Sequence, residues 1–415
     1  MNVDQERLRA DLETNGSFGA VSGVEGRGRT LFTGTESDRR AREYFVERLE
    51  ATGLDVRVDR VGNIAGQWTP VGCDPATPPI AAGSHLDSVD TGGIFDGPLG
   101  VYGALEAVRS IRESDADVGR PLEVVCFTEE EGGRFGRGTL GSSVATGRCS
   151  PTDALELVDD DGISLADRLR DIGFAGEDTI DASGWDGWLE LHIEQDTRLV
   201  EANATVGVVD SITGIANATV TIDGEANHAG STAMRDRTDA FCAAAEFVLD
   251  LERVATEHAR ESGTTVGTAG ELTVEPNARN IVPGEARLEL DIRDVDHDRM
   301  NDVVSGCRSS LARLERERGV VTELDRYRDV PPTPLSPNCI AAVEMAAGDC
   351  DVSAIGLHSA AMHDTANVAR VTDAGLLFAP SVGGVSHSPQ EWTDWSDCAT
   401  ATHVLADVVR VLATS

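Results

Sequence analysis

Short apolar segments alternate with helix-like segments along the first part of the chain. Residues 79–83 and 122–127 have the apolar character of buried parallel strands. Apolar positions recur at helical spacing in three segments, 38–52, 100–112 and 165–172. Residues 54–58 and 63–68 alternate like a hairpin, and residues 187–191 form a further strand. This alternation predicts an α/β domain whose central sheet is mostly parallel.

The pattern changes near residue 213. Four strands are expected there, at 216–222, 264–274, 286–292 and 320–327, with two long helices at 237–257 and 296–318. This β-α-β-β-α-β order is that of a ferredoxin-like α+β unit. After a proline-rich hinge at 330–337, an apolar strand at 376–379 resembles the first part again. We therefore expect a catalytic α/β domain, residues 1–212 and 329–415, interrupted by an inserted domain, residues 213–328.

The charge of the chain limits the cellular compartment and the classes of binding partner that it suits. The chain has 35 basic and 72 acidic residues, a net charge of −37, and every fixed cation is arginine. The acids are spread along the chain, which suggests a salt-rich cytoplasm that screens their repulsion. Nucleic acid and anionic membrane would be repelled, and no run of eighteen apolar residues or signal peptide is present. We expect a soluble cytoplasmic protein whose eight scattered cysteines are free thiols.

The absence of lysine also excludes several mechanisms. A Walker A phosphate loop, a Schiff base to a cofactor and a serine–lysine amidase apparatus all require a lysine. A pair of metal ions bridged by a modified lysine is excluded for the same reason. Any residue that bridges two metals here must be a carboxylate.

Histidines and carboxylates follow the predicted strands of the α/β domain. Ligands collect at the carboxyl ends of strands in open α/β sheets, and imidazole with carboxylate suits zinc and its divalent neighbours. Two groups that share Asp96 could hold two cations about 3.5–4 Å apart. The first group is His85, Asp96 and His192, and the second is Asp96, Glu131 and His387. Singly, each histidine suits an ordinary surface or core position, but together they favour a metal site.

Two further acids are assigned roles around this site. Asp87 lies two residues after His85 on the same strand face and could orient that imidazole. Glu130 should point away from Glu131 and could move a proton between water and a leaving nitrogen. The alternative for the Glu129-Glu130-Glu131 run is an exposed acidic loop. Its position directly after a buried strand favours the functional interpretation.

These residues stand in short motifs that resemble one known family. The motifs are His85-Leu86-Asp87-Ser88, Phe95-Asp96-Gly97-Pro98-Leu99-Gly100-Val101, Glu130-Glu131-Gly132-Gly133-Arg134-Phe135, Leu191-His192-Ile193-Glu194-Gln195, Asn227-His228-Ala229-Gly230, Pro276-Asn277-Ala278-Arg279-Asn280-Ile281-Val282-Pro283-Gly284 and Ser386-His387-Ser388-Pro389-Gln390-Glu391. In type and order they resemble the dinuclear-metal amidase/hydantoinase/carbamoylase family of the zinc metallopeptidase clan. That family includes N-carbamoyl-L-amino acid hydrolases, β-ureidopropionases and allantoate amidohydrolases. Related metallopeptidases of the clan usually place an aspartate where this chain has His192.

The resemblance implies roles for residues beyond the metal ligands. It implies that Gln195, His228, Asn280 and Arg293 contact the substrate, and that the inserted domain dimerises and reaches into the partner's site. An arginine fork suits a substrate carboxylate, although a salt bridge of Arg293 with Asp291 or Asp294 is an equal alternative.

The chain departs from the family at three positions. Ala360 and Met362 replace glycines of a glycine-rich segment that precedes His363, and Asp196 stands where glycine is usual. These changes bear on the shape and charge of the pocket. His363 remains a further candidate for the site.

The resemblance also implies the chemistry. We expect a homodimeric metal-dependent hydrolase that cleaves the C–N bond of N-carbamoyl-L-amino acids or a related ureido acid, releasing ammonia and CO2. Two divalent ions per chain are expected, zinc first, with manganese, cobalt or nickel as alternatives. Allantoate amidohydrolase or β-ureidopropionase activity is the alternative for the same site, followed by a dimetal peptidase or aminoacylase. A catalytically silent binding protein is disfavoured because all five ligands and Glu130 are retained.

Overall fold

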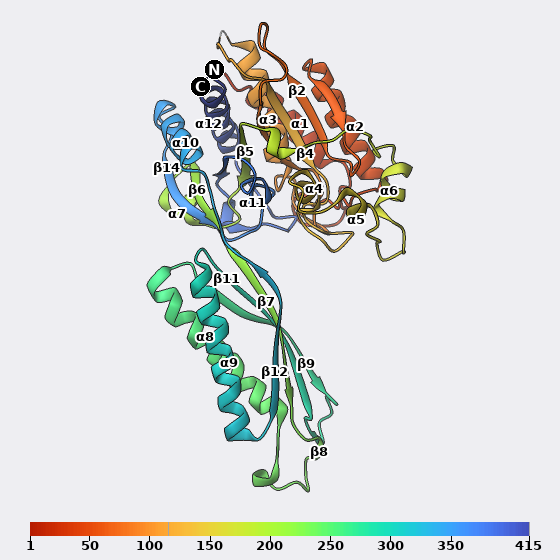
Figure 1. Ribbon diagram of the computed structural model, residues 1–415, viewed down its shortest axis with the longest axis vertical. Helices are drawn as coiled ribbons and strands as arrows, with labels where there is room; N and C mark the ends of the chain where they lie inside the picture. Colours follow the sequence, from red (N-terminus) through yellow and green to blue (C-terminus); the bar gives the residue numbers. More distant parts are fainter. Residues whose placement is uncertain (115, 415) are drawn as a thin grey trace. The chain divides into compact units, whose positions relative to one another are not determined.

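The computed structural model describes residues 1–114 and 116–414 and divides into two compact units (Figure 1). One unit comprises Met1–Asp210 with Leu335–Ser415, and the other is Ser211–Pro334. The predicted boundaries were residues 212 and 328. The observed inserted unit reaches further along the chain because strand β12 (Val321–Val330) stays paired with β7 (Gly214–Asp223) as far as Val330.

The larger unit is an α/β domain. Its longer helices are α1 (Gln5–Gly16), α2 (Glu36–Ala51), α3 (Pro98–Glu113), α10 (Pro337–Asp349) and α12 (Trp395–Thr414). Its short helices are α4 (Leu140–Ala145), α5 (Pro151–Leu155), α6 (Leu165–Asp171), α7 (Arg198–Ala202) and α11 (Thr365–Val368). The strands of its sheet are β1 (Asp55–Val58), β2 (Ile64–Trp68), β3 (Ile80–His85), β4 (Leu122–Phe127), β5 (Gly187–Ile193), β6 (Val206–Ile212), β13 (Thr333–Pro334), β14 (Ala354–Ser359) and β15 (Ala374–Ala379). Strand β6 ends just inside the range of the inserted unit, and β13 lies within that range.

These strands form one sheet with a parallel centre. The order is β1-β2-β4-β3-β5-β15-β6-β13, and β14 pairs with β6. Strands β4, β3, β5 and β15 run parallel, whereas β1, β2 and β6 add antiparallel edges. The predicted parallel centre and the predicted β1–β2 hairpin are confirmed. The four parallel strands end at one edge of the sheet, which is where an α/β domain places its ligands.

Helix α3 forms much of the core because it is apolar around most of its circumference. It packs against β3, β5 and α12, and Leu99, Val101, Tyr102 and Leu105 are fully buried. Each apolar side chain of this kind contributes about 1.5–3 kcal/mol when buried. Pro98 begins the helix, where its missing N–H costs no hydrogen bond. The helix is therefore a rigid base for the residues that precede it.

The inserted unit has the predicted ferredoxin-like order. Its elements are β7, β8 (Asn227–His228), α8 (Ala240–Ser262), β9 (Val266–Glu275), β10 (Ile281–Val282), β11 (Glu285–Asp294), α9 (His297–Arg318) and β12. The antiparallel sheet β12-β7-β11-β9 buries alternate residues of β7 and β11 beneath α8 and α9. Each long helix begins at an aspartate cap and ends at a left-handed glycine, Gly263 or Gly319. Within the described residues, every helix is too short or too polar to cross a membrane.

Candidate metal centre

The five predicted ligands meet at the carboxyl edge of the parallel strands. His85 is the last residue of β3, and His192 is the penultimate residue of β5. Glu131 lies in the turn after β4, and His387 lies in the segment after β15. Asp96 directly precedes Gly97 and α3. A Cβ on Gly97 would lie only 2.5 Å from His85 Cε1, and its φ of 82° also favours glycine, so glycine here lets Asp96 approach the histidine.

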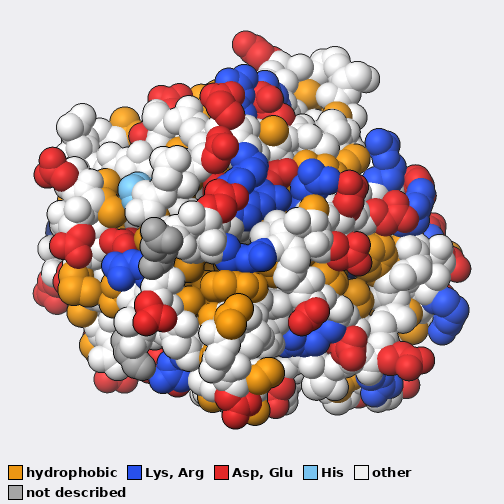
Figure 2. All heavy atoms as spheres, turned by 90° about the horizontal axis from the view of Figure 1, so that it is seen from above, with side chains coloured by type: hydrophobic (Ala, Val, Ile, Leu, Met, Phe, Trp, Pro, Cys, Tyr) orange, Lys and Arg blue, Asp and Glu red, His pale blue; other side chains and the backbone are white. Residues whose placement is uncertain are grey.

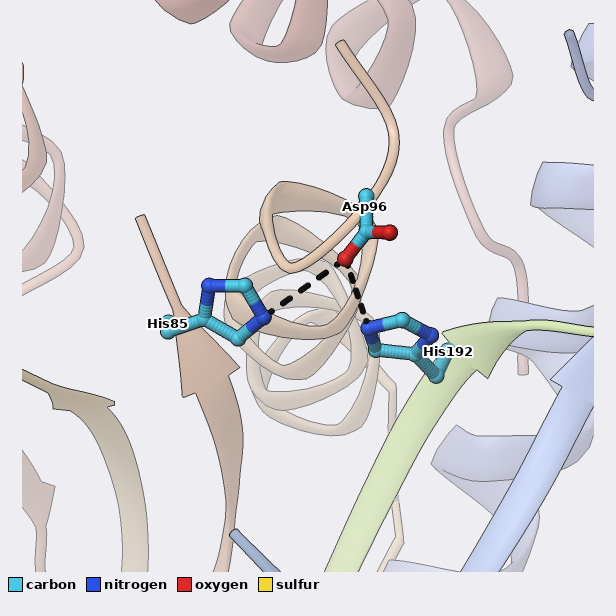
Figure 3. A group of neighbouring side chains, drawn as sticks. All are labelled: His85, Asp96 and His192. Carbon is cyan, nitrogen blue, oxygen red and sulfur yellow. Dashed lines mark ion pairs between the residues drawn. The ribbon is translucent and has the colours of Figure 1, made fainter. Parts of the chain in front are cut away.

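The first group consists of His85, Asp96 and His192 (Figure 3). Asp96 Oδ1 points between the two imidazoles, 3.7 Å from His85 Nε2 and 3.2 Å from His192 Nε2. All three side chains are buried. The two rings are stacked with their centroids 6.0 Å apart, so both Nε2 atoms face the carboxylate oxygen. This is an enclosed three-ligand group of nitrogen and oxygen.

The second group uses the other oxygen of the same aspartate. His387 Nε2 lies 3.6 Å from Asp96 Oδ2 and 3.4 Å from Glu131 Oε2. The His387 side chain is half exposed, whereas both carboxylates are buried or nearly so. Because Oδ1 faces one group and Oδ2 the other, Asp96 is placed as a bridge.

The hydrogen bonds of the two buried histidines determine which nitrogen faces the site. His85 Nδ1 lies 3.1 Å from the carbonyl oxygen of Asp87, and His192 Nδ1 lies 3.0 Å from that of Ile193. A carbonyl oxygen only accepts, so each Nδ1 carries the hydrogen and donates it. Each Nε2 is therefore the ring nitrogen that faces Asp96, and it is the nitrogen that a metal ion beside that carboxylate would bind.

The donor set and its spacing fit divalent cations. Ligand atoms bound at about 2.0 Å to a tetrahedral cation lie about 3.3 Å apart, close to the separations found here. Buried carboxylates need a compensating positive charge, and this edge of the sheet carries more acids than cations. The two buried histidines have opposite pKa shifts. Burial lowers the pKa of His85 to about 4. Burial also opposes charge on His192, but the Asp96 carboxylate outweighs it and raises that pKa to about 9.

Asp87 contacts the His85 imidazole through its main chain, while its carboxylate holds the turn after β4. Its oxygens accept hydrogen bonds from the backbone N–H groups of Glu130 (3.2 Å) and Glu131 (3.0 Å). The imidazole of His85 is held instead by the main-chain carbonyl of Asp87, with the nearer carboxylate oxygen 3.7 Å from Nδ1. Asp87 thus contacts both the imidazole and the backbone of the two glutamates, so its role as a positioning residue stays a prediction that these contacts support.

Glu130 lies beside the first group. Its side chain is 10% exposed, and Oε2 is 3.7 Å from His85 Nε2. Burial, followed by the charges of Asp364 and Glu131, raises the pKa of Glu130 well above its usual range. The neighbouring Glu129 has a different role, because its Oε1 accepts from the N–H groups of Arg134 and Phe135. Of the acidic run, Glu130 and Glu131 therefore face the site.

Gln195 and Ser386 hold the outer oxygen of Asp96. Gln195 Nε2 donates to Asp96 Oδ2 (2.8 Å) and to Ser386 Oγ (2.9 Å), and Ser386 Oγ donates to the same Oδ2 (2.7 Å). Gln195 was predicted to contact the substrate, and its side chain does lie at the site. Ser386 and the buried Glu391, which accepts from the Asp96 N–H, were given no role. Both residues lie in the same sequence motif as His387, and this is the sequence feature that could have indicated a role at the site.

Three residues around the site have left-handed backbones that are unusual outside glycine. Glu129, Gln195 and His387 have φ values of 56°, 60° and 52°. Such conformations cost about 1–3 kcal/mol each and persist only where the surroundings impose them. Their gathering at this edge agrees with a site whose geometry is selected for chemistry.

The remaining predicted contacts with substrate belong to the inserted unit. His228 is exposed, and its Nδ1 accepts from the N–H groups of Gly230 and Ser231, so Nε2 carries the hydrogen and is a donor. Asn280 is also exposed, and its carbonyl accepts from Ala229 N. Arg293 pairs with Asp291 through both Nε (2.8 Å) and Nη2 (3.2 Å), which is the salt bridge considered from the sequence.

His363 and Asp196 are at the border of the site. The buried His363 ring packs edge-on against His192, with centroids 4.6 Å apart, and its Nε2 lies 3.0 Å from Ser359 Oγ. It therefore supports a candidate ligand and is not in either three-ligand group. Asp196 is half exposed and pairs with Arg198 at 2.9 Å.

The comparisons with known proteins identify the family of the chain. Peptidase family M20/M25/M40 matches residues 81–411. The N-carbamoyl-L-amino-acid amidohydrolase of Paenarthrobacter aurescens is 36% identical over 98% of this chain and 98% of its own. The allantoate amidohydrolase of Bacillus subtilis is 33% identical over 88% of each chain. The crystal structure of an amidase of the hydantoinase/carbamoylase family from Burkholderia multivorans is 31% identical, with a TM-score of 0.93 over 100% of this chain and 98% of that one. The chain therefore belongs to peptidase family M20/M25/M40 and, within it, to the amidase, hydantoinase/carbamoylase family.

Proposed function

We propose that this protein is a metal-dependent hydrolase that cleaves the C–N bond of N-carbamoyl-L-amino acids, releasing the amino acid, ammonia and CO2. The observation that carries the proposal is the pair of three-ligand groups that share Asp96, with Glu130 beside them. Full-length similarity to an N-carbamoyl-L-amino-acid amidohydrolase supports the substrate class. The reaction consumes one water, which must be activated and then protonate the nitrogen that leaves.

The proposed ligands are His85, Asp96 and His192 for one ion, and Asp96, Glu131 and His387 for the other. Divalent cations held there would supply Lewis acidity, polarising the ureido carbonyl and making water acidic enough to attack near neutral pH. The nitrogen and oxygen donors suit zinc, with manganese, cobalt and nickel as alternatives. The sharing of Asp96 makes occupancy of the two positions interdependent.

Glu130 is the proposed proton carrier. Its Oε2 would take the proton of the attacking water and deliver it to the leaving nitrogen. Its position 3.7 Å from His85 Nε2 leaves it beside the ligands without being part of either group. Asp87 supports this role, because its carboxylate holds the backbone of Glu130 and Glu131 in place.

Arg293, His228 and Asn280 are the proposed contacts for the rest of the substrate. Arg293 would exchange Asp291 for the substrate carboxylate, which its planar fork suits. The Nε2–H of His228 would donate to the oxyanion of the tetrahedral intermediate. These residues lie in the inserted unit, and we propose a homodimer in which that unit completes the partner's site.

An ammonia-release assay tests the proposal. Metal-free protein is reloaded with zinc, manganese or cobalt and supplied with N-carbamoyl-L-amino acids, their D-enantiomers, β-ureidopropionate and allantoate. Ammonia release from the L-carbamoyl compounds, with about two metal ions per chain, is expected. Asp96→Ala should lose both ions and all activity, and absence of activity in fully loaded wild-type protein would contradict the proposal.

The same assay distinguishes the second candidate. Similarity to an allantoate amidohydrolase favours allantoate as the alternative ureido substrate. A preference for allantoate or β-ureidopropionate over every carbamoyl amino acid would identify the protein as an allantoate amidohydrolase or a β-ureidopropionase instead. Release of amino acids from dipeptides or N-acyl amino acids, without ammonia, would instead identify a peptidase or aminoacylase.

A further inference from the structure

A buried glutamate outside both ligand groups binds the backbone of the bridging aspartate. Glu391 is 2% exposed, and its Oε1 accepts from Asp96 N (3.1 Å) and from Phe95 N (2.9 Å). Asp96 and Glu391 are separated by 295 residues in the chain. The contact therefore joins the loop that carries Asp96 to the segment that carries His387.

The Asp96 loop is shaped around this carboxylate. A Cβ on Gly93 would lie 2.1 Å from Glu391 Oε1 and 2.2 Å from its Cδ, so only glycine admits the carboxylate there. The Phe95 ring meets Trp392 edge-on, with centroids 5.4 Å apart, which reinforces the same junction. The two loops are thus joined by both hydrogen bonds and aromatic packing.

Glu391 also approaches the hydrogen bonds on the Asp96 side chain. Its Oε2 lies 3.3 Å from Ser386 Oγ, which donates to Asp96 Oδ2 at 2.7 Å. One glutamate therefore contacts the backbone N–H of Asp96 and the hydroxyl that orients its outer oxygen. That outer oxygen is the one that faces Glu131 and His387.

A buried arginine stands behind the glutamate. Arg29 is fully buried, and its Nε donates to the carbonyl of Gly93 at 2.9 Å. Its two terminal nitrogens have no hydrogen-bond partner among the described residues. Burial lowers the pKa of Arg29, and the charge of Glu391 is the largest of the nearby acidic charges that oppose this. The guanidinium thus offsets negative charge in the layer beneath the ligands while fixing the glycine that admits Glu391.

We infer that Glu391 is a positioning residue that sets the separation between Asp96 and His387 and thereby the affinity of the second metal position. The inference rests on the proposed ligand set. Partners that orient metal ligands typically change metal affinity by about 10–100-fold when they are removed. Glu391 acts through the two hydrogen bonds that it accepts from backbone N–H groups. Metal affinity should therefore depend more on the length of this side chain than on its charge.

Two substitutions separate reach from charge. Glu391→Asp keeps the charge but withdraws the carboxylate by one methylene from the N–H groups of Phe95 and Asp96. Glu391→Gln loses the charge but keeps an acceptor oxygen at full reach. Glu123→Asp is the matched control, because Glu123 is a buried glutamate that accepts from Trp185 Nε1 near the opposite end of β4.

Calorimetric titration of the metal-free full chain with zinc measures both dissociation constants directly. For Glu391→Asp we expect one of the two dissociation constants, assigned to the position of Asp96, Glu131 and His387, to rise about 10–100-fold. Glu391→Gln should recover most of the loss, and Glu123→Asp should bind as wild type does. Unchanged dissociation constants in Glu391→Asp, or a larger loss in Glu391→Gln than in Glu391→Asp, would overturn the inference.

The wild-type titration separates this inference from the proposed function. Wild-type protein that binds only one ion would contradict the shared-aspartate site itself, and the role of Glu391 with it. Two wild-type ions with unaffected Glu391 variants would contradict only the positioning role. If Glu391→Asp does not fold, Ser386→Ala is the alternative variant, because Ser386 lies between Glu391 and Asp96 Oδ2. It should also lower the metal affinity of the second position.

Discussion

At the scale of single residues, two aspartates of the site each use both carboxylate oxygens for different partners. Asp96 divides its two oxygens between the two ligand groups, and Asp87 divides its own between two consecutive backbone N–H groups. Burial acts to raise the pKa of Asp96, but the imidazoles of His192, His85 and His387 lower it well below its usual range. A carboxylate that bridges two cations, the role proposed for Asp96, must stay ionised, and these neighbours favour its ionised form.

A substitution at Glu130 tests the proton carrier. In Glu130→Gln the amide cannot accept a proton from water, while the side chain keeps its size and the metal ligands are untouched. We expect turnover to fall by at least about 10²–10⁴-fold with metal content unchanged. The measurements are ammonia release and metal analysis of the same preparation. Near-normal turnover in fully loaded Glu130→Gln protein would remove Glu130 from the mechanism.

At the scale of elements, the turn after β4 is held by a network behind the site. Arg134 donates to Asp159 Oδ2 (2.9 Å) and to the Thr33 carbonyl (2.9 Å), and Arg168 donates to the same Asp159 oxygen. The Asp159 Oδ1 atom accepts from the N–H groups of Asp161 and Ile163. The turn that carries Glu130 and Glu131 is thereby anchored to the loop before α6.

The pKa of Asp159 makes this anchor dependent on pH. Burial acts to raise it, but the Ile163 N–H, Arg168 and Arg134 outweigh burial and lower it to about 2. An unfolded aspartate has a pKa of about 3.9, so the folded state binds the proton less tightly than the unfolded state. The stabilisation is complete above about pH 4 and is lost as the pH falls through about 2.

We therefore expect Asp159→Asn to destabilise the protein at neutral pH and to match it more closely in acid. The measurement is the free energy of unfolding in urea between about pH 6 and pH 2, with a chelator present so that metal loss does not contribute. Asp161→Asn is the control, because Asp161 pairs with the same Arg168 but is 73% exposed. A gap between wild type and Asp159→Asn that does not shrink in acid would contradict this origin of the pKa shift.

At the scale of the whole molecule, the 72 acidic residues are spread along the whole chain. Acidic side chains and arginines are interspersed over the face drawn in Figure 2. The net charge of −37 nevertheless implies long-range repulsion within the folded chain. The Debye length falls from about 30 Å at 0.01 M salt to about 3 Å at 1 M, so added salt should relieve that repulsion.

The corresponding prediction is a melting temperature that rises with potassium chloride. Thermal unfolding is followed from low ionic strength to molar salt with metal content held constant. A second monovalent salt at the same ionic strengths serves as the control, because screening depends on ionic strength and not on the identity of the salt. A melting temperature that is flat or falls with salt would show that self-repulsion does not limit the stability of this chain.

Subunit mixing tests whether two chains share each site. Glu130→Gln and Arg293→Ala proteins should each be inactive alone. In a mixed dimer, one site receives an intact Glu130 from one chain and an intact Arg293 from the other. Random exchange makes roughly half the dimers mixed, so activity can recover to about a quarter of wild type. No recovery despite demonstrated exchange would mean that each site is built within one chain.

The sequence was sufficient for the architecture and the family. Hydrophobic runs and alternation identified the parallel strands, the ferredoxin-like order and the interruption of one domain by another, because burial of a strand or helix face is written in its periodicity. The motifs identified the family, which the comparisons confirm. The assignments of the metal ligands, the substrate contacts and the dimer remain predictions.

Only the tertiary structure decided how the candidate residues divide their contacts. The sequence placed Asp87 near His85, but the fold turned its carboxylate towards the backbone of Glu130 and Glu131. It likewise brought Glu391 to the backbone of Asp96, from which it is 295 positions away in the chain. Periodicity reports which face of an element is buried, whereas a hydrogen bond between distant loops depends on where both loops end in space. That is set by packing of the whole domain and has no local pattern in the chain.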